Sequence, residues 1–159
     1  GDRVWHRPGA ELFLGIDHTA LTVRSTEHSL AFYRDVLRLR VAGGSSNTGT
    51  EQEYLDSLPR ALVRVTGLVP ELGPPGVEFL EYELPEAGRP MPADSKPTDL
   101  WHWQTTMVVT DVDEAASALR GKARFVSPDV VRLSDAALGF RKGFQVRDPD
   151  GHVLLLVAP

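Results

Sequence analysis

The chain alternates between stretches in which every second residue is apolar and stretches with apolar residues at helical spacing. Residues 18–33, HTALTVRSTEHSLAFY, contain an alternating stretch, a turn and then a helical pattern. Residues 104–119, QTTMVVTDVDEAASAL, repeat this order without gaps at a constant offset of 86 residues. Strand residues alternate between two faces, whereas helix residues return to one face every three or four positions. The pattern therefore predicts two copies of a strand followed by a helix.

Both predicted helices begin at a polar residue that can cap the first turn. The first helix begins at Ser25 or Thr26 and carries apolar residues at helical spacing as far as Leu37. The second begins at Asp111, which can form a capping box with Glu114. The apolar stripes on both helices indicate that each packs on a sheet.

Each helix is followed by shorter apolar stretches that we predict to be strands. In the first half these are residues 38–42, which end at the break Gly43-Gly44, then 61–68 and 77–83, with a short helix at 51–57. In the second half they are residues 123–126, 140–146 and 152–157, the last following the turn DPDG. The fold class predicted is α+β, with two βαβββ modules.

A proline-rich segment separates the two halves. Residues 83–100, ELPEAGRPMPADSKPTDL, contain four prolines and no periodic pattern, which is typical of an extended connector. We therefore predict a single domain with one module over about residues 12–83, a linker over about 84–99 and a second module over about 100–159. Residues 1–15 are either a preceding strand or an arm.

Strand alternation indicates which side chains face a cleft between the modules. One face of the first strand carries His18, and the corresponding face of the second copy carries His102 and Gln104. The opposite faces are more apolar and belong under the helices. In residues 77–83 the alternation separates Glu78 from Glu81, and periodicity alone does not decide which of them faces the cleft.

Composition and charge narrow the function classes. With 159 residues, 42% apolar, the chain is the size of one globular domain. Its net charge of −5 and the absence of a Lys/Arg run argue against nucleic acid, and no apolar stretch is long enough to span a membrane. We take a soluble, cytoplasmic location as the default, although the sequence leaves the compartment open. The chain has no cysteine, so a metal would need His, carboxylate or amide ligands.

Four stretches in order resemble the vicinal oxygen chelate superfamily, which includes glyoxalase I, bleomycin-resistance proteins and extradiol dioxygenases. They are IDHTALTVRSTEHSLAFYRDVLRLRV, VEFLEY, VVTDVDEA and DPDGHVLLLV. The resemblance implies paired βαβββ modules that form a half-open barrel around a small-molecule site, often completed by dimerisation. It therefore implies a small organic ligand and a homodimer as partners.

The resemblance also implies where metal ligands would lie. Metal-dependent members draw one ligand from each of four strands, and by position these are His18, Glu78, Gln104 and Leu155. This assignment places Glu78 on the cleft side. Leu155 carries no donor atom where the family pattern has a carboxylate, so the implied metal site is incomplete. A divalent metal stays open as a cofactor, and none is favoured.

Other side chains are candidates for the wall of the pocket. Tyr82 and Phe140 supply aromatic surface, and His102 lies on the same face as Gln104. Arg141, in GFRKGF, either holds an anionic group of a ligand or belongs to a solvated turn. His18 is either a pocket residue or a hydrogen-bonded core residue. For two tryptophans packing is the expected role, Trp103 under the helix and Trp101 against the linker.

Two functions from different classes follow. The first is a binding protein that takes up a small organic molecule without the full metal site. The second is a metal-dependent lyase, isomerase or dioxygenase acting on vicinal oxygens, in which Glu78 shuttles a proton. The missing fourth ligand favours the first, and the sequence does not decide whether the protein is an enzyme.

Overall fold

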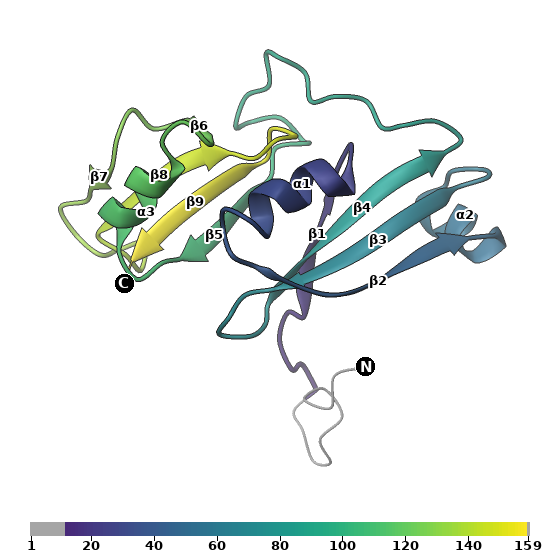
Figure 1. Ribbon diagram of the computed structural model, residues 1–159, viewed down its shortest axis with the longest axis horizontal. Coiled ribbons are helices and arrows are strands. Elements are labelled where there is room, and N and C mark those ends of the chain that lie inside the picture. Colours follow the sequence, from purple (N-terminus) through teal and green to yellow (C-terminus); the bar gives the residue numbers. More distant parts are fainter. Residues whose placement is uncertain (1–11, 159) are drawn as a thin grey trace.

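A computed structural model describes residues 12–158 and shows one β-sheet for each half of the chain (Figure 1). Most of the N-terminal segment for which the sequence left a strand or an arm open lies outside the described residues. The fold is α+β, as predicted, and within residues 12–158 three helices accompany the two sheets. The sheets stay separate and do not close into a barrel.

The first module consists of the elements up to β4. They are β1 (His18–Thr22), α1 (Thr26–Tyr33), β2 (Arg40–Thr48), α2 (Thr50–Asp56), β3 (Leu62–Val69) and β4 (Gly76–Leu84). The strand order is β1-β4-β3-β2, with β1 parallel to β4 and the other neighbours antiparallel.

The second module repeats this topology. Its elements are β5 (Gln104–Val108), α3 (Val112–Leu119), β6 (Arg124–Phe125), β7 (Val131–Arg132), β8 (Lys142–Arg147) and β9 (Val153–Ala158). The order β5-β9-β8-β6 matches β1-β4-β3-β2, and β5 is again parallel to β9. The repeat read from the sequence is therefore a repeat of strand order in space.

Both helix starts lie where the sequence placed them. The Ser25 hydroxyl accepts a hydrogen bond from the backbone N–H of His28, and the Asp111 carboxylate accepts from the amides of Asp113 and Glu114. The first helix ends earlier than predicted, at Tyr33. The chain then turns, and Arg38 adopts a φ of 66°, which a right-handed helix does not tolerate.

The strand β2 differs most from the prediction, because it continues through Gly43-Gly44, where a break was expected. Its pairing with β3 shifts register between Val41 and Gly43, which is a β-bulge. A Cβ on Gly44 would lie 2.7 Å from the Val65 carbonyl oxygen. The two glycines therefore accommodate a bulge and a close approach of strands inside one continuous strand.

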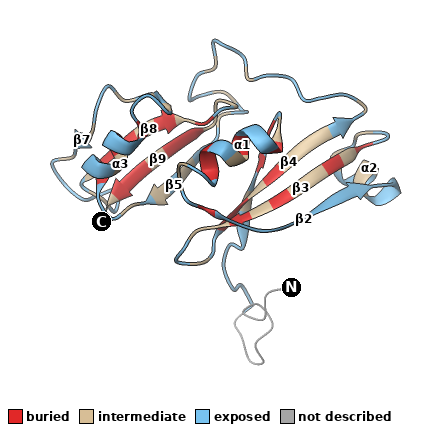
Figure 2. Ribbon diagram, in the orientation of Figure 1, coloured by how far each residue is buried: buried red, intermediate tan, exposed pale blue. Residues whose placement is uncertain are grey.

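The helix-facing sides of the sheets form one core that joins the modules (Figure 2). Leu21 and Phe79 are buried under α1, and Phe144 and Leu154 are buried in the second module. Phe79 is buried and Glu78 is not. In β4 the side chain of Glu78 therefore lies on the face of the sheet away from the helix.

The face of each sheet opposite α1 or α3, here called the open face, is largely uncovered within one chain. Every residue of β2 is exposed. Along β5 the predicted open-face positions Gln104, Thr106 and Val108 are also exposed. The apolar side chain of Val108 on this face is 67% exposed within one chain.

The modules are joined covalently by the linker and non-covalently by α1. In Figure 1 the linker arches from the end of β4 to the start of β5 and contains no helix or strand. The buried Tyr33 hydroxyl of α1 donates to Asp148 Oδ2 in the DPDG turn at 2.9 Å, and the Ser29 hydroxyl donates to Asp150 at 3.2 Å. No helix of the described residues is long and apolar enough to cross a membrane.

Candidate functional site

Two of the predicted site residues, His18 and Glu78, meet on the open face of the first sheet. Glu78 pairs in register with Ala20, two residues along β1 from His18, so both side chains leave the same face. His18 Nε2 lies 3.6 Å from Glu78 Oε1. The side chains are 42% and 27% exposed, so the pair is reachable from solvent.

Asp17 orients this pair, although the sequence analysis did not identify it. Its Oδ2 lies 2.8 Å from His18 Nδ1. An imidazole held at one ring nitrogen presents the other in a fixed direction, here toward Glu78. The signal available in the sequence was an acidic residue directly before the strand histidine.

Glycines create the space beside Glu78. Gly67 pairs with Glu78 across β3 and β4, and Gly43 pairs with Gly67 across β2 and β3. With Ala20 on the other side of Glu78, the carboxylate stands in a row of positions with little or no side chain. A hollow of about 440 Å³ lies here, and its lining includes His18, Glu78 and Gly67 but neither Ala20 nor Gly43; its volume is within the roughly 300–1,000 Å³ typical of small-molecule sites.

The strand register in the second module places Leu155 at the counterpart of Glu78. Leu155 pairs with Thr106, just as Glu78 pairs with Ala20, and Thr106 and Ala20 are equivalent in the repeat. Leu155 and its open-face neighbour Val157 are both hydrocarbon, and the Phe140 ring packs over Gly143 beside them. The open face of the second sheet is therefore apolar where the first carries a carboxylate.

Gln104 is not brought to His18 and Glu78 within one chain. Its Oε1 accepts a hydrogen bond from Gln145 Nε2 at 2.6 Å, on the open face of the second sheet. Gln104 does not line the hollow that contains His18 and Glu78. Gln145 was not identified from the sequence, because the two amides come together only through β9, which pairs with β5 on one side and with β8 on the other.

The remaining candidates lie elsewhere. Tyr82 shares the Glu78 face but sits near α2, where burial and the neighbouring Asp56 raise its pKa. Arg141 is exposed and donates to the Ser134 carbonyl at 3.3 Å, as a loop contact does. His102 lines a different, larger cavity between the modules.

The two tryptophans beside His102 have different surroundings. Trp101 Nε1 donates to Ser95 Oγ at 3.1 Å, which confirms the expected contact with the linker. Trp103 is 46% exposed, so the expectation that it packs under the helix is wrong. It directly precedes the first residue of β5 and lines the same cavity as His102.

The donor atoms of one chain do not fit a four-ligand metal site. Among residues 12–158, no group of three or more His, Asp or Glu side chains is arranged to hold a metal ion. His18 and Glu78 offer two donors, the Gln104 amide is bonded to Gln145, and Leu155 offers none. This geometry is compatible with ligand binding by the first module without a complete metal centre.

Comparisons with known proteins agree with this architecture. A family model described as Glyoxalase/Bleomycin resistance protein/Dioxygenase superfamily matches residues 15–156. A search of curated protein sequences found no significant match.

Among solved structures, a glyoxalase family protein from Bacillus cereus is 18% identical, with a TM-score of 0.74 over 96% of this chain and 98% of that one. Glyoxalase I from Leishmania major is 19% identical, with a TM-score of 0.55 over 91% and 86%. The fosfomycin resistance protein FosX from Listeria monocytogenes, solved with Mn(II) and sulfate, is 15% identical, with a TM-score of 0.57 over 93% and 94%. These similarities show a shared fold.

Proposed function

The chain belongs to the Glyoxalase/Bleomycin resistance protein/Dioxygenase superfamily, and we propose that it is a member that binds a small organic molecule without the full metal site. The ligand would occupy the hollow beside Glu78 on the first sheet. His18 and Glu78 supply polar contacts at the floor of this hollow, and the glycine row leaves room for the ligand.

The observation that carries this proposal is Leu155 at the register position equivalent to Glu78. A divalent cation with nitrogen and oxygen ligands needs a donor there, and a hydrocarbon side chain excludes one.

We further propose that the protein acts as a homodimer, with a second copy covering the open faces. The support is the exposure of the whole of β2 and of Val108 within one chain. A second copy would cover this surface and enclose the hollow, where water is excluded and polar contacts gain strength.

Analytical ultracentrifugation should show a dimer for the wild type and a shift toward monomer for Val108→Asp, with Leu138→Asp, on an exposed loop, as control. A monomeric wild type would contradict this part of the proposal.

The second candidate function is a metal-dependent lyase, isomerase or dioxygenase. It is favoured by the 3.6 Å approach of His18 Nε2 to Glu78 Oε1 and by the Mn(II) in the FosX structure. In that case His18 and Glu78 would hold the ion together with Gln104 or His102, neither of which lines the hollow within one chain, and the ion would polarise vicinal oxygens of the substrate. If the ion were held without Glu78, the carboxylate of this residue would be available to move a proton.

Metal analysis separates the two candidates. The full chain is purified without chelator, incubated separately with nickel, zinc, manganese or iron(II), and passed through a desalting column before its metal content is measured. The binding-protein proposal expects less than one metal per chain in every case, with wild type and Glu78→Gln alike. One metal per wild-type chain that is lost in Glu78→Gln would overturn it in favour of the metalloenzyme.

A further inference from the structure

A second cavity, of about 1310 Å³, lies between the two modules and is separate from the hollow beside Glu78. It is lined by the end of β1, by the linker and by residues 147–152 around the DPDG turn. No residue lines both cavities. The proposed function does not use this space, so its chemistry can be considered independently.

Two arginines face each other across neighbouring strands at the wall of this cavity. Arg124 in β6 and Arg147 in β8 are cross-strand partners, so their side chains leave the same face of the sheet. Like charges in directly opposite positions destabilise a sheet. Among the described residues neither guanidinium pairs with a carboxylate, whereas Arg34, Arg64 and Arg120 all do. One terminal nitrogen of Arg147 donates to the Gly151 carbonyl oxygen at 2.6 Å, which leaves the other N–H groups of this guanidinium for a ligand.

The carboxylates that line the cavity are already occupied. Asp148 is buried and accepts from the backbone amides of Asp150, Gly151 and His152 through Oδ1, and from Tyr33 through Oδ2. Asp150 accepts from the Arg24 amide and the Ser29 hydroxyl. Both aspartates keep their negative charge, but in the part of the chain that the structure describes neither forms an ion pair with Arg124 or Arg147, so these two guanidinium groups have no carboxylate partner at the cavity wall.

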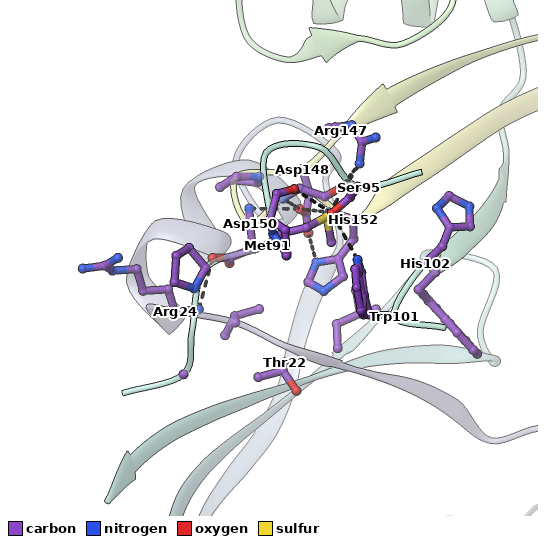
Figure 3. A pocket seen from close by; sticks show the side chains of 18 of the residues that line it. Thr22, Arg24, Met91, Ser95, Trp101, His102, Arg147, Asp148, Asp150 and His152 are labelled. Carbon is purple, nitrogen blue, oxygen red and sulfur yellow. Dashed lines mark hydrogen bonds and ion pairs between the residues drawn. The ribbon is translucent and has the colours of Figure 1, made fainter. Parts of the chain in front are cut away.

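His152 adds a directed polar atom. Its Nδ1 lies 2.9 Å from Asp148 Oδ2, which fixes the ring. Figure 3 shows the His152 ring in the middle of the side chains that line the cavity, whereas the Arg24 guanidinium points away at the edge. No described residue hydrogen-bonds to Nε2 of His152, so this atom can contact a molecule in the cavity.

Aromatic surface completes the site. Trp101 and Trp103 line the same cavity and are 55% and 46% exposed. The Trp101 indole is held by its hydrogen bond to Ser95 and so presents a fixed flat surface. Flat aromatic side chains with a few convergent polar groups are typical of sites for planar organic molecules.

We propose that this cavity is a second binding site, which takes a small aromatic carboxylate. The carboxylate lies between the guanidinium groups of Arg124 and Arg147, in the bidentate manner for which guanidinium is suited. The ring packs against the indole of Trp101, and His152 Nε2 contacts the polar end of the molecule. The bound anion relieves the repulsion between the two arginines.

The test is calorimetric titration of the full chain with 2-naphthoate and, as an uncharged match, 2-naphthamide. The expected result is one 2-naphthoate per chain, bound at least about tenfold more tightly than the amide, as expected for a charge-assisted contact. Arg124→Gln and Trp101→Ala should each weaken binding about tenfold. Arg132→Gln, an exposed arginine outside the cavity, and His18→Ala, in the other hollow, should leave it unchanged.

Each other outcome overturns the inference. Equal binding of 2-naphthoate and 2-naphthamide, or no binding of either, contradicts a carboxylate site. Binding that is lost in His18→Ala and kept in Arg124→Gln would place the ligand beside Glu78, which would support the proposed function and refute this site. Because the Arg124 side chain contacts no described residue through an ion pair or hydrogen bond, its replacement tests binding without disturbing the fold.

Discussion

Tyr33→Phe removes a single oxygen from the buried contact between the two modules. The Tyr33 hydroxyl donates to Asp148 Oδ2 at 2.9 Å, and the ring packs edge-on against Phe32 and Phe79, with centroids 5.4 and 5.0 Å away. Burial, together with the charge of Asp148, raises the pKa of Tyr33 far above its usual range. The hydroxyl is therefore a neutral donor at every working pH.

The expected loss follows from what remains after the substitution. A hydrogen bond to a charged acceptor contributes about 1.5–3 kcal/mol to stability. Phenylalanine keeps the ring contacts, and Asp148 keeps three backbone amides and His152, so no group is left without partners. We expect the low end of the range, about 1.5 kcal/mol, which corresponds to about 3–6 °C in Tm for a chain of this size.

The assay is urea unfolding followed by circular dichroism, at one protein concentration for all variants because association shifts apparent stability. Tyr54→Phe is the matched control, since Tyr54 is 81% exposed and its change should stay within about 0.5 kcal/mol. If Tyr33→Phe is no more destabilising than Tyr54→Phe, the docking of α1 on the DPDG turn is not as described.

Three further predictions concern a cap, a close approach and a pH dependence. Asp111→Ala should lower the free energy of unfolding by about 1 kcal/mol, because α3 loses two capping hydrogen bonds; an unchanged urea midpoint would contradict the cap. Gly76→Ala should cost about 1–3 kcal/mol, since its Cβ would lie 2.7 Å from the Leu68 carbonyl oxygen, whereas Gly43→Ala meets nothing within 4 Å; equal unfolding energies would refute the close approach. Burial alone would lower the pKa of His152, but the hydrogen bond and charge of Asp148 outweigh it and hold this pKa above its usual value. The free energy of unfolding of wild type should therefore exceed that of His152→Gln by its full amount below pH about 6.5, and this difference should decrease as pH rises through the raised pKa. A difference that grows with pH would contradict the prediction.

Local periodicity was sufficient to predict the repeated part of the fold. The helix starts at Ser25 and Asp111 follow from side chains that bond amides two or three residues away. The burial of Leu21 and the exposure of Gln104 follow from strand alternation, which needs only the sequence. Both depend on near neighbours in the chain.

The parts that sequence reasoning missed depend on distant neighbours. Whether Gly43-Gly44 ends a strand or forms a bulge is decided by β3, whose Val65 carbonyl approaches Gly44. The contact of Tyr33 with Asp148 spans 115 residues, so DPDG was recognised only as a turn and not as the docking point of α1.

The candidate site likewise combines features that the sequence predicts with features that depend on residues distant in the chain. Periodicity left the face of Glu78 open, and the family resemblance placed it on the face of His18; in the structure His18 Nε2 lies 3.6 Å from Glu78 Oε1. The pairing that puts Gly67 beside Glu78 and Gln145 beside Gln104 is set by strand register across the sheets, which periodicity does not specify. Gln104 stays apart from His18 because the two residues belong to different sheets and the Gln104 amide is bonded to Gln145.

The absence of a fourth metal ligand at Leu155 can be tested by calorimetric titration of wild type and Leu155→Glu with Mn²⁺. Leu138→Glu, on an exposed loop, is the control. If Leu155 occupies the place of a missing fourth ligand in the proposed homodimer, wild type and Leu138→Glu take up less than one ion per chain. Leu155→Glu should then bind Mn²⁺ at least about tenfold more tightly than either. Tight binding of one Mn²⁺ per wild-type chain, with no gain in Leu155→Glu, would contradict the account.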